Sequence, residues 1–225
     1  MDILIENLVH EALRWDEEDN WKKRKCEQKT IHLDHLKDII RSCGVSFDIW
    51  EKTNADAKGS GQYDFTSLLG PDKKKLLKEL PHKFEGVIQP AAENEVENLW
   101  VKFSIIYSIV TCKTPSEHMI TDYFCKAQEW INLFLSLRDK CIGYKMANVT
   151  PYMHAMVYHI PKFLEAYKTV KIFSGQGVEK NNDMARSIVL RKSNKWDGAG
   201  DYATLERRQV KCRSSHVPTQ MQTLF

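Results

Sequence analysis

Residues 173–197 read FSGQGVEKNNDMARSIVLRKSNKWD, and this stretch holds most of the chemistry that the sequence displays. Its Ser-Gly-Gln-Gly segment carries two glycines, which tolerate the positive φ angles of a tight turn. Apolar residues then recur at helical spacing from Val178 to Val189, so a helix is predicted to begin near the second glycine. Glu179 falls in its first turn, where the helix dipole favours a carboxylate.

Two interpretations of Glu179 are open. In the first, it is a helix-start acid that precedes a solvated basic face. In the second, Glu179 binds a divalent metal ion while basic residues contact phosphates nearby, namely Lys180, Arg186, Arg191, Lys192 and Lys195. Because hard cations take several oxygen ligands, one glutamate does not make a metal site by itself.

The charge distribution favours a nucleic-acid partner for this part of the chain. Residues 179–213 contain nine Lys or Arg and five Asp or Glu, which leaves a net charge of +4, whereas the whole chain carries +3. The basic excess is therefore local, as expected of an element that faces nucleic acid.

The composition is that of an ordinary globular protein. The 225 residues are 42% hydrophobic and 28% charged, enough to form one sizeable core or two small ones. The six cysteines are scattered without a CxxC pair, and no signal peptide precedes them, which predicts reduced thiols and an intracellular location. The longest apolar run, residues 103–112, is too short to span a bilayer, so no membrane partner is expected.

Outside the opening stretch, apolar periodicity predicts a mainly α-helical bundle. Gly44 is expected to end the second helix in the C′ position, and residues 16–25 are expected to form a polar linker. The predicted helices cover residues 1–15, 30–43, 72–80, 93–112 and 115–137, with another from 150 that breaks near Pro161. The two long helices are expected to form an antiparallel pair. The chain starts abruptly with a strong helix, which predicts that it was cut from something longer.

One small β-hairpin is predicted within residues 46–66, where two alternating segments flank a Gly-containing loop. An isolated hairpin is marginal in water, so Phe47, Ile49, Tyr63 and Phe65 are expected to pack on the helices. Farther along, the lysines at 73, 74, 75, 78 and 83 are interpreted as a solvated helix face rather than a site.

His154 and His159 are candidate metal ligands with an awkward spacing. On an ideal helix, side chains five residues apart point about 140° away from each other, whereas ligand pairs on one face are four apart. The residues alone therefore leave two alternatives open: a pair of zinc ligands, or one core and one surface histidine.

Residues 152–161 (YMHAMVYHIP) and 173–182 (FSGQGVEKNN) together resemble the end of a known catalytic core. It is that of the V(D)J recombination-activating recombinase and the Transib transposases. Their order of His-x4-His-hydrophobic-Pro, aromatic-x-Ser and Gly-x-Glu-x-x-Asn is preserved here over about 60 residues. The chain is also similar to transposon-derived proteins present in many copies in invertebrate genomes.

The resemblance implies the C-terminal end of an RNase H-like core that follows a helical insertion. Such enzymes cut and join DNA with two divalent metal ions, Mg or Mn, held by an Asp, Asp, Glu triad. Glu179 matches the last carboxylate of the triad. His154 and His159 match two ligands of a structural zinc site, where a bend at Pro161 would bring them together. The implied partners are DNA and the upstream transposase core, a dimer is possible, and the implied location is the nucleus.

The sequence keeps only part of this machinery. The two family aspartates and the zinc-binding cysteine pair would lie upstream of Met1, and this chain has no CxxC. One carboxylate cannot place two metal ions on a phosphate, so the chain alone is expected to be inactive as a nuclease and to retain nonspecific DNA binding.

The expected organisation has three parts. Residues 1–170 form the helical insertion-like region, residues 171–212 hold the acid-bearing basic helix and a final helix, and residues 213–225 form a flexible tail. Two other functions are compatible with the sequence: a non-catalytic helical module that binds a protein partner, and a fragment without an independent role.

Overall fold

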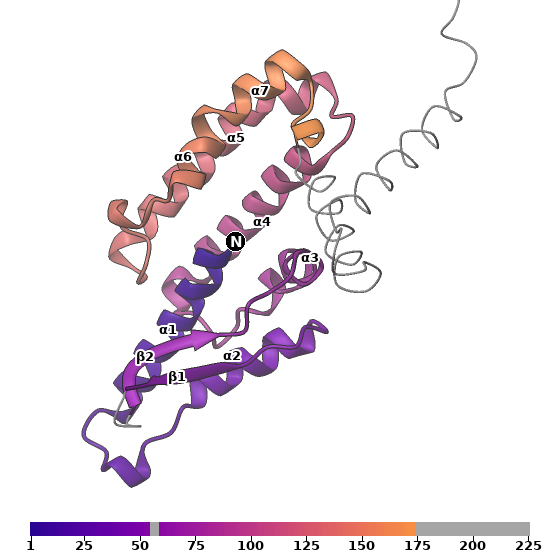
Figure 1. Cartoon of the computed structure of the whole chain (residues 1–225). Helices are drawn as coiled ribbons and strands as arrows, with labels where there is room; N and C mark the ends of the chain where they lie inside the picture. Colours follow the sequence, from indigo (N-terminus) through magenta and orange to yellow (C-terminus); the bar gives the residue numbers. More distant parts are fainter. Residues whose placement is uncertain (55–58, 174–225) are drawn as a thin grey trace, which may run out of the picture. The chain divides into compact units, whose positions relative to one another are not determined.

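The computed structural model describes residues 1–54 and 59–173, which form seven α-helices and one pair of strands (Figure 1). The helices are α1 (Asp2–Asn20), α2 (Ile31–Ser42), α3 (Gly70–Glu79), α4 (Pro90–Thr111), α5 (Glu117–Ser136), α6 (Pro151–Tyr158) and α7 (Ile160–Tyr167). The strands are β1 (Ile49–Thr53) and β2 (Gly59–Phe65). The predicted mainly α-helical class with one small hairpin is confirmed. Residues 1–172 make up one compact unit. Of the predicted part 171–212, residues 174–212 lie outside the described residues, as does the predicted tail 213–225.

The helices α4 and α5 form the antiparallel pair that their aromatic stripes predict. The contacts show the direction, because the partner on α5 lies earlier in the chain as α4 advances: the Trp130 indole N–H donates to the Leu99 carbonyl at 3.0 Å, and Lys102 pairs with Glu129 at 2.6 Å. Trp130 is 1% exposed, and its ring lies 5.5 Å from that of Phe103 between centroids. Burial of such large aromatic surfaces is the main stabilising contribution of this pair.

The first two helices are joined by a carboxylate rather than only by apolar contacts. Asp16 accepts hydrogen bonds from the backbone N–H groups of His32 at 2.9 Å and Leu33 at 3.0 Å, which satisfies two unpaired donors at the start of α2. The prediction that residues 16–25 form a linker is wrong for its first part, because α1 continues to Asn20. Asp16 is 4% exposed and belongs to the helix interface, although its type suggests a loop.

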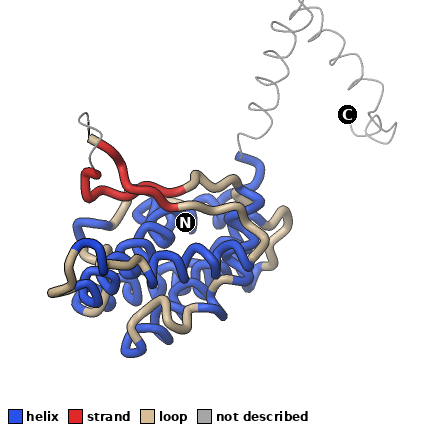
Figure 2. Tube along the Cα trace, turned by 90° about the horizontal axis from the view of Figure 1, so that it is seen from below, coloured by secondary structure: helices blue, strands red, loops and turns tan. Residues whose placement is uncertain are grey.

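The hairpin packs on the helices through one face. Ile49 pairs with Phe65 at the open end of the antiparallel ladder, and Phe47 and Ile49 are buried while Tyr63 and Phe65 are half-buried against the core. Figure 2 shows the two strands along one side of the helices. The predicted packing of these side chains is confirmed. Gly44 has a φ of +71° directly after α2, as predicted for a C′ glycine.

The segment after α5 is held by polar side chains of α1. Asn7 donates to the carbonyl of Gly143 at 3.3 Å, and the buried carboxylate of Glu11 accepts from the backbone N–H of Ile142. Gly143 has a φ of +87°, and a Cβ there would overlap the Asn7 side chain. This contact joins residues 136 positions apart in sequence and closes the bundle.

The helices α6 and α7 run along α5 (Figure 1). Leu164 and Val157 are buried in this layer, whereas Tyr152 and Tyr158 are exposed. Within the described part of the chain, no helix combines the length and the apolar character needed to cross a bilayer.

Candidate functional site

The break between α6 and α7 determines where the two candidate histidines lie. The Thr150 hydroxyl caps α6 by accepting from the Met153 N–H at 3.3 Å, and α6 ends at Tyr158. His159 joins the helices with φ −103° and ψ −44°, two residues before Pro161. Because proline lacks an N–H and disfavours helical geometry just before it, a continuous helix cannot pass this point unchanged. The predicted break near Pro161 is confirmed.

As a result, the rings of His154 and His159 lie close together. Their centroids are 5.2 Å apart with an angle of 57° between the planes, and both side chains are exposed. The alternative of one core and one surface histidine is wrong, because neither side chain is in the core. The His154 ring also contacts Tyr158 at 4.9 Å between centroids. The two rings form one exposed cluster at the junction of α6 and α7.

The geometry of the pair fits two ligands of one zinc ion. With Zn–N bonds of about 2.0–2.1 Å and a tetrahedral angle, two bound imidazole rings have centroids about 5 Å apart. The observed 5.2 Å satisfies this condition. Within residues 1–54 and 59–173, however, no three His, Cys, Asp or Glu side chains gather closely enough to hold a metal ion. The described residues thus offer two candidate ligands, while a structural zinc site has four.

The remaining predicted site residues lie outside the described residues. These are Glu179, the candidate ligand of Mg or Mn, and the candidate DNA-binding residues Lys180, Arg186, Arg191, Lys192 and Lys195. Their roles stay predictions.

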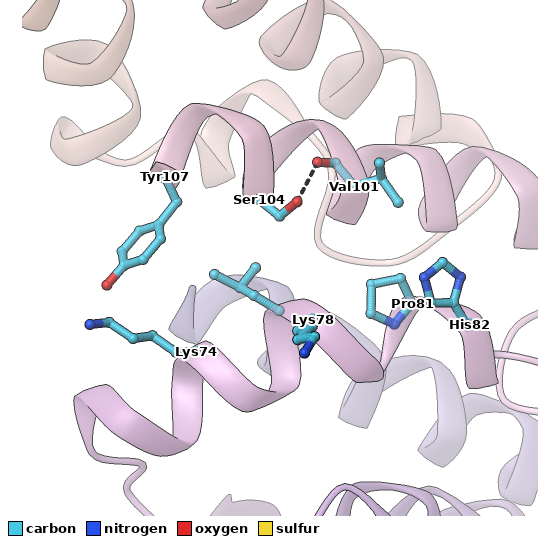
Figure 3. Close-up of a pocket in the computed structure, with 8 residues that line it drawn as sticks. Lys74, Lys78, Pro81, His82, Val101, Ser104 and Tyr107 are labelled. Atoms are coloured by element: carbon cyan, nitrogen blue, oxygen red, sulfur yellow. Dashed lines mark hydrogen bonds between the residues drawn. The ribbon is translucent and has the colours of Figure 1, made fainter. Parts of the chain in front are cut away.

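A pocket of about 350 Å³ lies between α3 and α4 (Figure 3). Its apolar floor consists of Leu77 and Pro81 from the α3 side and Val101 from α4. Its polar wall includes Lys74 and Lys78, which stand one helical turn apart on α3. The sequence did not predict this site, because its second wall is formed by residues of the next helix, Val101, Ser104 and Tyr107 of α4.

The lysines that were interpreted as one solvated face fall into two groups. Three of the five are held by neighbours: Lys73 pairs with Asp2 at 2.7 Å, Lys75 donates to the Gly44 carbonyl at 3.1 Å, and Lys83 donates to the Ser42 hydroxyl at 2.9 Å. By contrast, Lys74 and Lys78 have no acidic partner among the described residues, although they are exposed like Lys75. The solvated-face prediction is therefore right about exposure for Lys74, Lys75 and Lys78 but misses the pocket that two of them line.

Polar groups differ between the two ends of this pocket. Figure 3 shows the Lys74 ammonium and the Tyr107 hydroxyl at one end, with Pro81 and His82 at the other. His82 Nδ1 lies 3.1 Å from a Glu97 carboxylate oxygen, and the Ser104 hydroxyl donates to the Val101 carbonyl at 2.8 Å. One end thus carries a positive charge without an acidic partner, while the histidine at the other end pairs with a carboxylate that does not line the pocket.

A larger pocket of about 730 Å³ lies where the start of α1 meets α4, α5, α6 and α7. Its lining is mainly apolar and includes Ile3, Phe103, Val110, Met153, Met156 and Ile160. Periodicity alone gave no signal that a space remains between these helices.

Comparisons of the chain with protein-family models, curated proteins and solved structures found no match. The geometry of the described residues is therefore the main support for a function.

Proposed function

We propose that this chain is the C-terminal part of a transposon-derived, RNase H-like DDE transposase or recombinase. The observation that carries the proposal is the meeting of the His154 and His159 rings at 5.2 Å. In the resembled family these two positions bind one zinc ion, which requires that their side chains converge despite a spacing of five residues. The break ahead of Pro161 provides that convergence.

In this proposal the chain does not cut DNA by itself. Glu179 would be one of three carboxylates that bind two Mg or Mn ions, and a single carboxylate cannot position both ions on a phosphate. The zinc site, with His154 and His159 as two of its ligands, would be completed by a cysteine pair from an upstream segment. Residues 1–170 would be the helical insertion, and the protein would act in the nucleus.

The remaining activity is nonspecific DNA binding through Lys180, Arg186, Arg191, Lys192 and Lys195. Contacts to phosphates release counterions, so the affinity falls steeply with salt and varies little with sequence. The logarithm of the binding constant changes with the logarithm of salt concentration with a slope of about −0.9 for each phosphate contact.

The test is binding of the full chain to a labelled duplex over a range of salt concentrations. Replacing Lys180, Arg186, Arg191 and Lys192 together with Gln is expected to abolish retention at moderate salt and to make the slope less steep by about 3–4. The matched control replaces four exposed lysines of the described region, Lys25, Lys113, Lys145 and Lys162, and is expected to change the slope much less. Binding that does not respond to salt would contradict the proposal.

The catalytic half of the proposal is tested in a longer protein. Genomic DNA read in frame upstream of Met1 is expected to encode two aspartates and a CxxC. In the lengthened protein, Glu179→Gln is expected to lose strand cleavage while it keeps DNA binding, since the side chain contacts metal rather than DNA. Stop codons directly upstream would instead indicate a relic or a repurposed module.

The apolar pocket of about 730 Å³ favours a second candidate function, a helical module that binds a protein partner. Under this alternative, the fourfold replacement in the basic segment leaves the function intact. Substitution of an exposed pocket residue such as Tyr152, which is 86% exposed, would be the damaging change.

A further inference from the structure

We propose that the pocket between α3 and α4 binds one nucleotide of an unpaired DNA strand, with the phosphate near Lys74 and Lys78 and the base over Leu77, Pro81 and Val101. The choice of DNA as the source of that nucleotide rests on the proposed function. The pocket itself is a site separate from the histidine pair and from the basic segment that begins at Lys180.

The charge around the pocket selects an anion. Lys74 and Lys78 have no acidic partner among the described residues, whereas the neighbouring Lys73 is neutralised by Asp2 at 2.7 Å. The Tyr107 hydroxyl lies at the same end as the Lys74 ammonium (Figure 3). Figure 3 shows the Lys78 ammonium farther along α3, so Lys74 and Tyr107 provide the donors for phosphate oxygens at this end and Lys78 adds positive charge along the same wall. Charge-assisted bonds of this kind are stronger than neutral ones.

The floor selects a flat apolar group beside the anion. Leu77 and Pro81 are buried except where they face the pocket, and Val101 is half-buried on the opposite wall. The volume of about 350 Å³ lies at the small end of the range for ligand pockets. Such a space suits one nucleotide, and a base must leave its pair and its stack to enter it.

The two ends of the pocket orient the nucleotide. The phosphate belongs at the Lys74 end, because an ammonium without an acidic partner lies there, whereas His82 at the other end already pairs with the Glu97 carboxylate. The base then lies toward Pro81 and His82, where the Ser104 hydroxyl oxygen can accept a hydrogen bond from a base N–H. Binding of this kind contacts phosphate and base surface and therefore discriminates little between sequences.

The first experiment uses the ¹⁵N-labelled full chain and thymidine 5′-monophosphate as the probe. Saturable shifts are expected for the backbone amides of Leu77, Val101 and Tyr107. Inorganic phosphate alone is expected to shift only amides near Lys74 and Lys78, and thymidine alone only those along the floor. Shifts that spread over lysines throughout the chain, or no shift in the pocket, would overturn the proposal.

Charge removal gives the second test. Lys74→Gln with Lys78→Gln is expected to weaken thymidine monophosphate binding by at least about ten-fold, because two charge-assisted contacts are lost. The control, Lys113→Gln with Lys162→Gln, removes the same charge from exposed positions elsewhere and is expected to leave the affinity unchanged. If both double substitutions weakened thymidine monophosphate binding equally, binding would depend on the net charge of the chain rather than on the pocket, and the proposal would be overturned.

Filling the pocket tests the floor without changing charge. Ser104→Phe places a ring between the α3 and α4 walls and is expected to abolish the shifts caused by thymidine while phosphate still binds. Thermal melting shows whether this variant folds. If it does not, Val101→Ile replaces it as a smaller filling change, with weaker thymidine binding as the expected result. Unchanged thymidine binding in the folded variant would contradict the assigned floor.

Failure of this inference and failure of the proposed function give different results. If the variant lacking Lys180, Arg186, Arg191 and Lys192 loses duplex binding while the monophosphate still shifts the pocket amides, both proposals stand. If thymidine monophosphate causes no shift of the pocket amides while the chain still binds duplex DNA, the nucleotide site is refuted and the proposed function stands. A short unpaired thymidine oligonucleotide is expected to bind more tightly than the monophosphate, and an oligonucleotide that fails to bind would identify free nucleotides as the ligand and refute the DNA assignment.

Discussion

The carboxylate of Asp16 caps a helix to which it does not belong, with its Oδ2 atom 3.0 Å from the backbone nitrogen of Leu33. Its other oxygen lies 2.9 Å from the backbone nitrogen of His32. A side chain in the last part of α1 thus accepts hydrogen bonds from the first free N–H groups of α2. If the two helices separated, both the carboxylate and these N–H groups would lose their hydrogen-bond partners.

Asp16→Ala is expected to lower the free energy of unfolding by about 2 kcal/mol, because it removes a buried cap for two N–H groups. Urea unfolding followed by circular dichroism measures the change. The neighbouring Glu17 is exposed, and Glu17→Ala is expected to change the same quantity by less than about 0.5 kcal/mol. Similar effects of the two substitutions would show that the cap does not stabilise the α1–α2 pair.

Burial raises the pKa of the Glu11 carboxyl above its ordinary value of 4.5, although the Ile142 N–H and Arg14 oppose the shift. The folded chain therefore holds a proton that the unfolded chain has lost, and stability due to Glu11 falls as pH rises from 4.5 through the raised folded pKa. Glu11→Gln cannot ionise, so the stability of the wild type relative to this variant is expected to be greater at pH about 4 than at about 7. Urea unfolding at both pH values tests this, and a difference that grows with pH would contradict it.

Burial also raises the pKa of the Cys141 thiol to about 12. Since the thiolate is the reactive form, alkylation of Cys141 in the native protein is expected to be on the order of 10²–10³ times slower than that of the exposed Cys125. Pulses of iodoacetamide at neutral pH followed by peptide mass spectrometry measure both rates. In urea the two rates should become similar, and fast labelling of native Cys141 would show that α1 does not cover it.

The histidine pair is expected to bind Zn²⁺ weakly, because the described residues provide two of the usual four ligands. His154→Ala and His159→Ala should each weaken binding by at least about ten-fold, because each removes one of the two nitrogen ligands. Titration calorimetry measures the affinity. His118 is exposed on α5, and His118→Ala serves as the control that leaves the affinity unchanged.

The helices and the hairpin could be predicted because their determinants are close together in sequence. Gly44 ends α2, Ser116 caps α5 with its side chain, and Pro151 opens α6 after Thr150, and each of these signals acts within a few residues. The wrong prediction of a linker at residues 16–25 also came from relying on local signals. Aspartate is typical of loops, and no pattern near Asp16 in the sequence shows that its side chain contacts the backbone of Leu33.

The candidate sites depend on packing to different degrees. The sequence identified His154 and His159 as candidate ligands, but on an ideal helix their side chains would point about 140° apart. In the structure the helix is interrupted before Pro161 and the two rings lie 5.2 Å apart. The pocket lined by Lys74 and Lys78 could not be predicted from the sequence, since Val101 and Tyr107 line it only when α3 packs against α4.

The amino-acid sequence by itself determined the mainly helical class, the hairpin between α2 and α3, and the residue types available for chemistry, because backbone preferences and apolar periodicity act over one or two turns. Tertiary structure alone decided which of five lysines stay free, which carboxylate caps a neighbouring helix, and how closely two histidine rings approach. These outcomes follow from contacts between residues distant in the chain, whose free energy is gained only when the helices pack together.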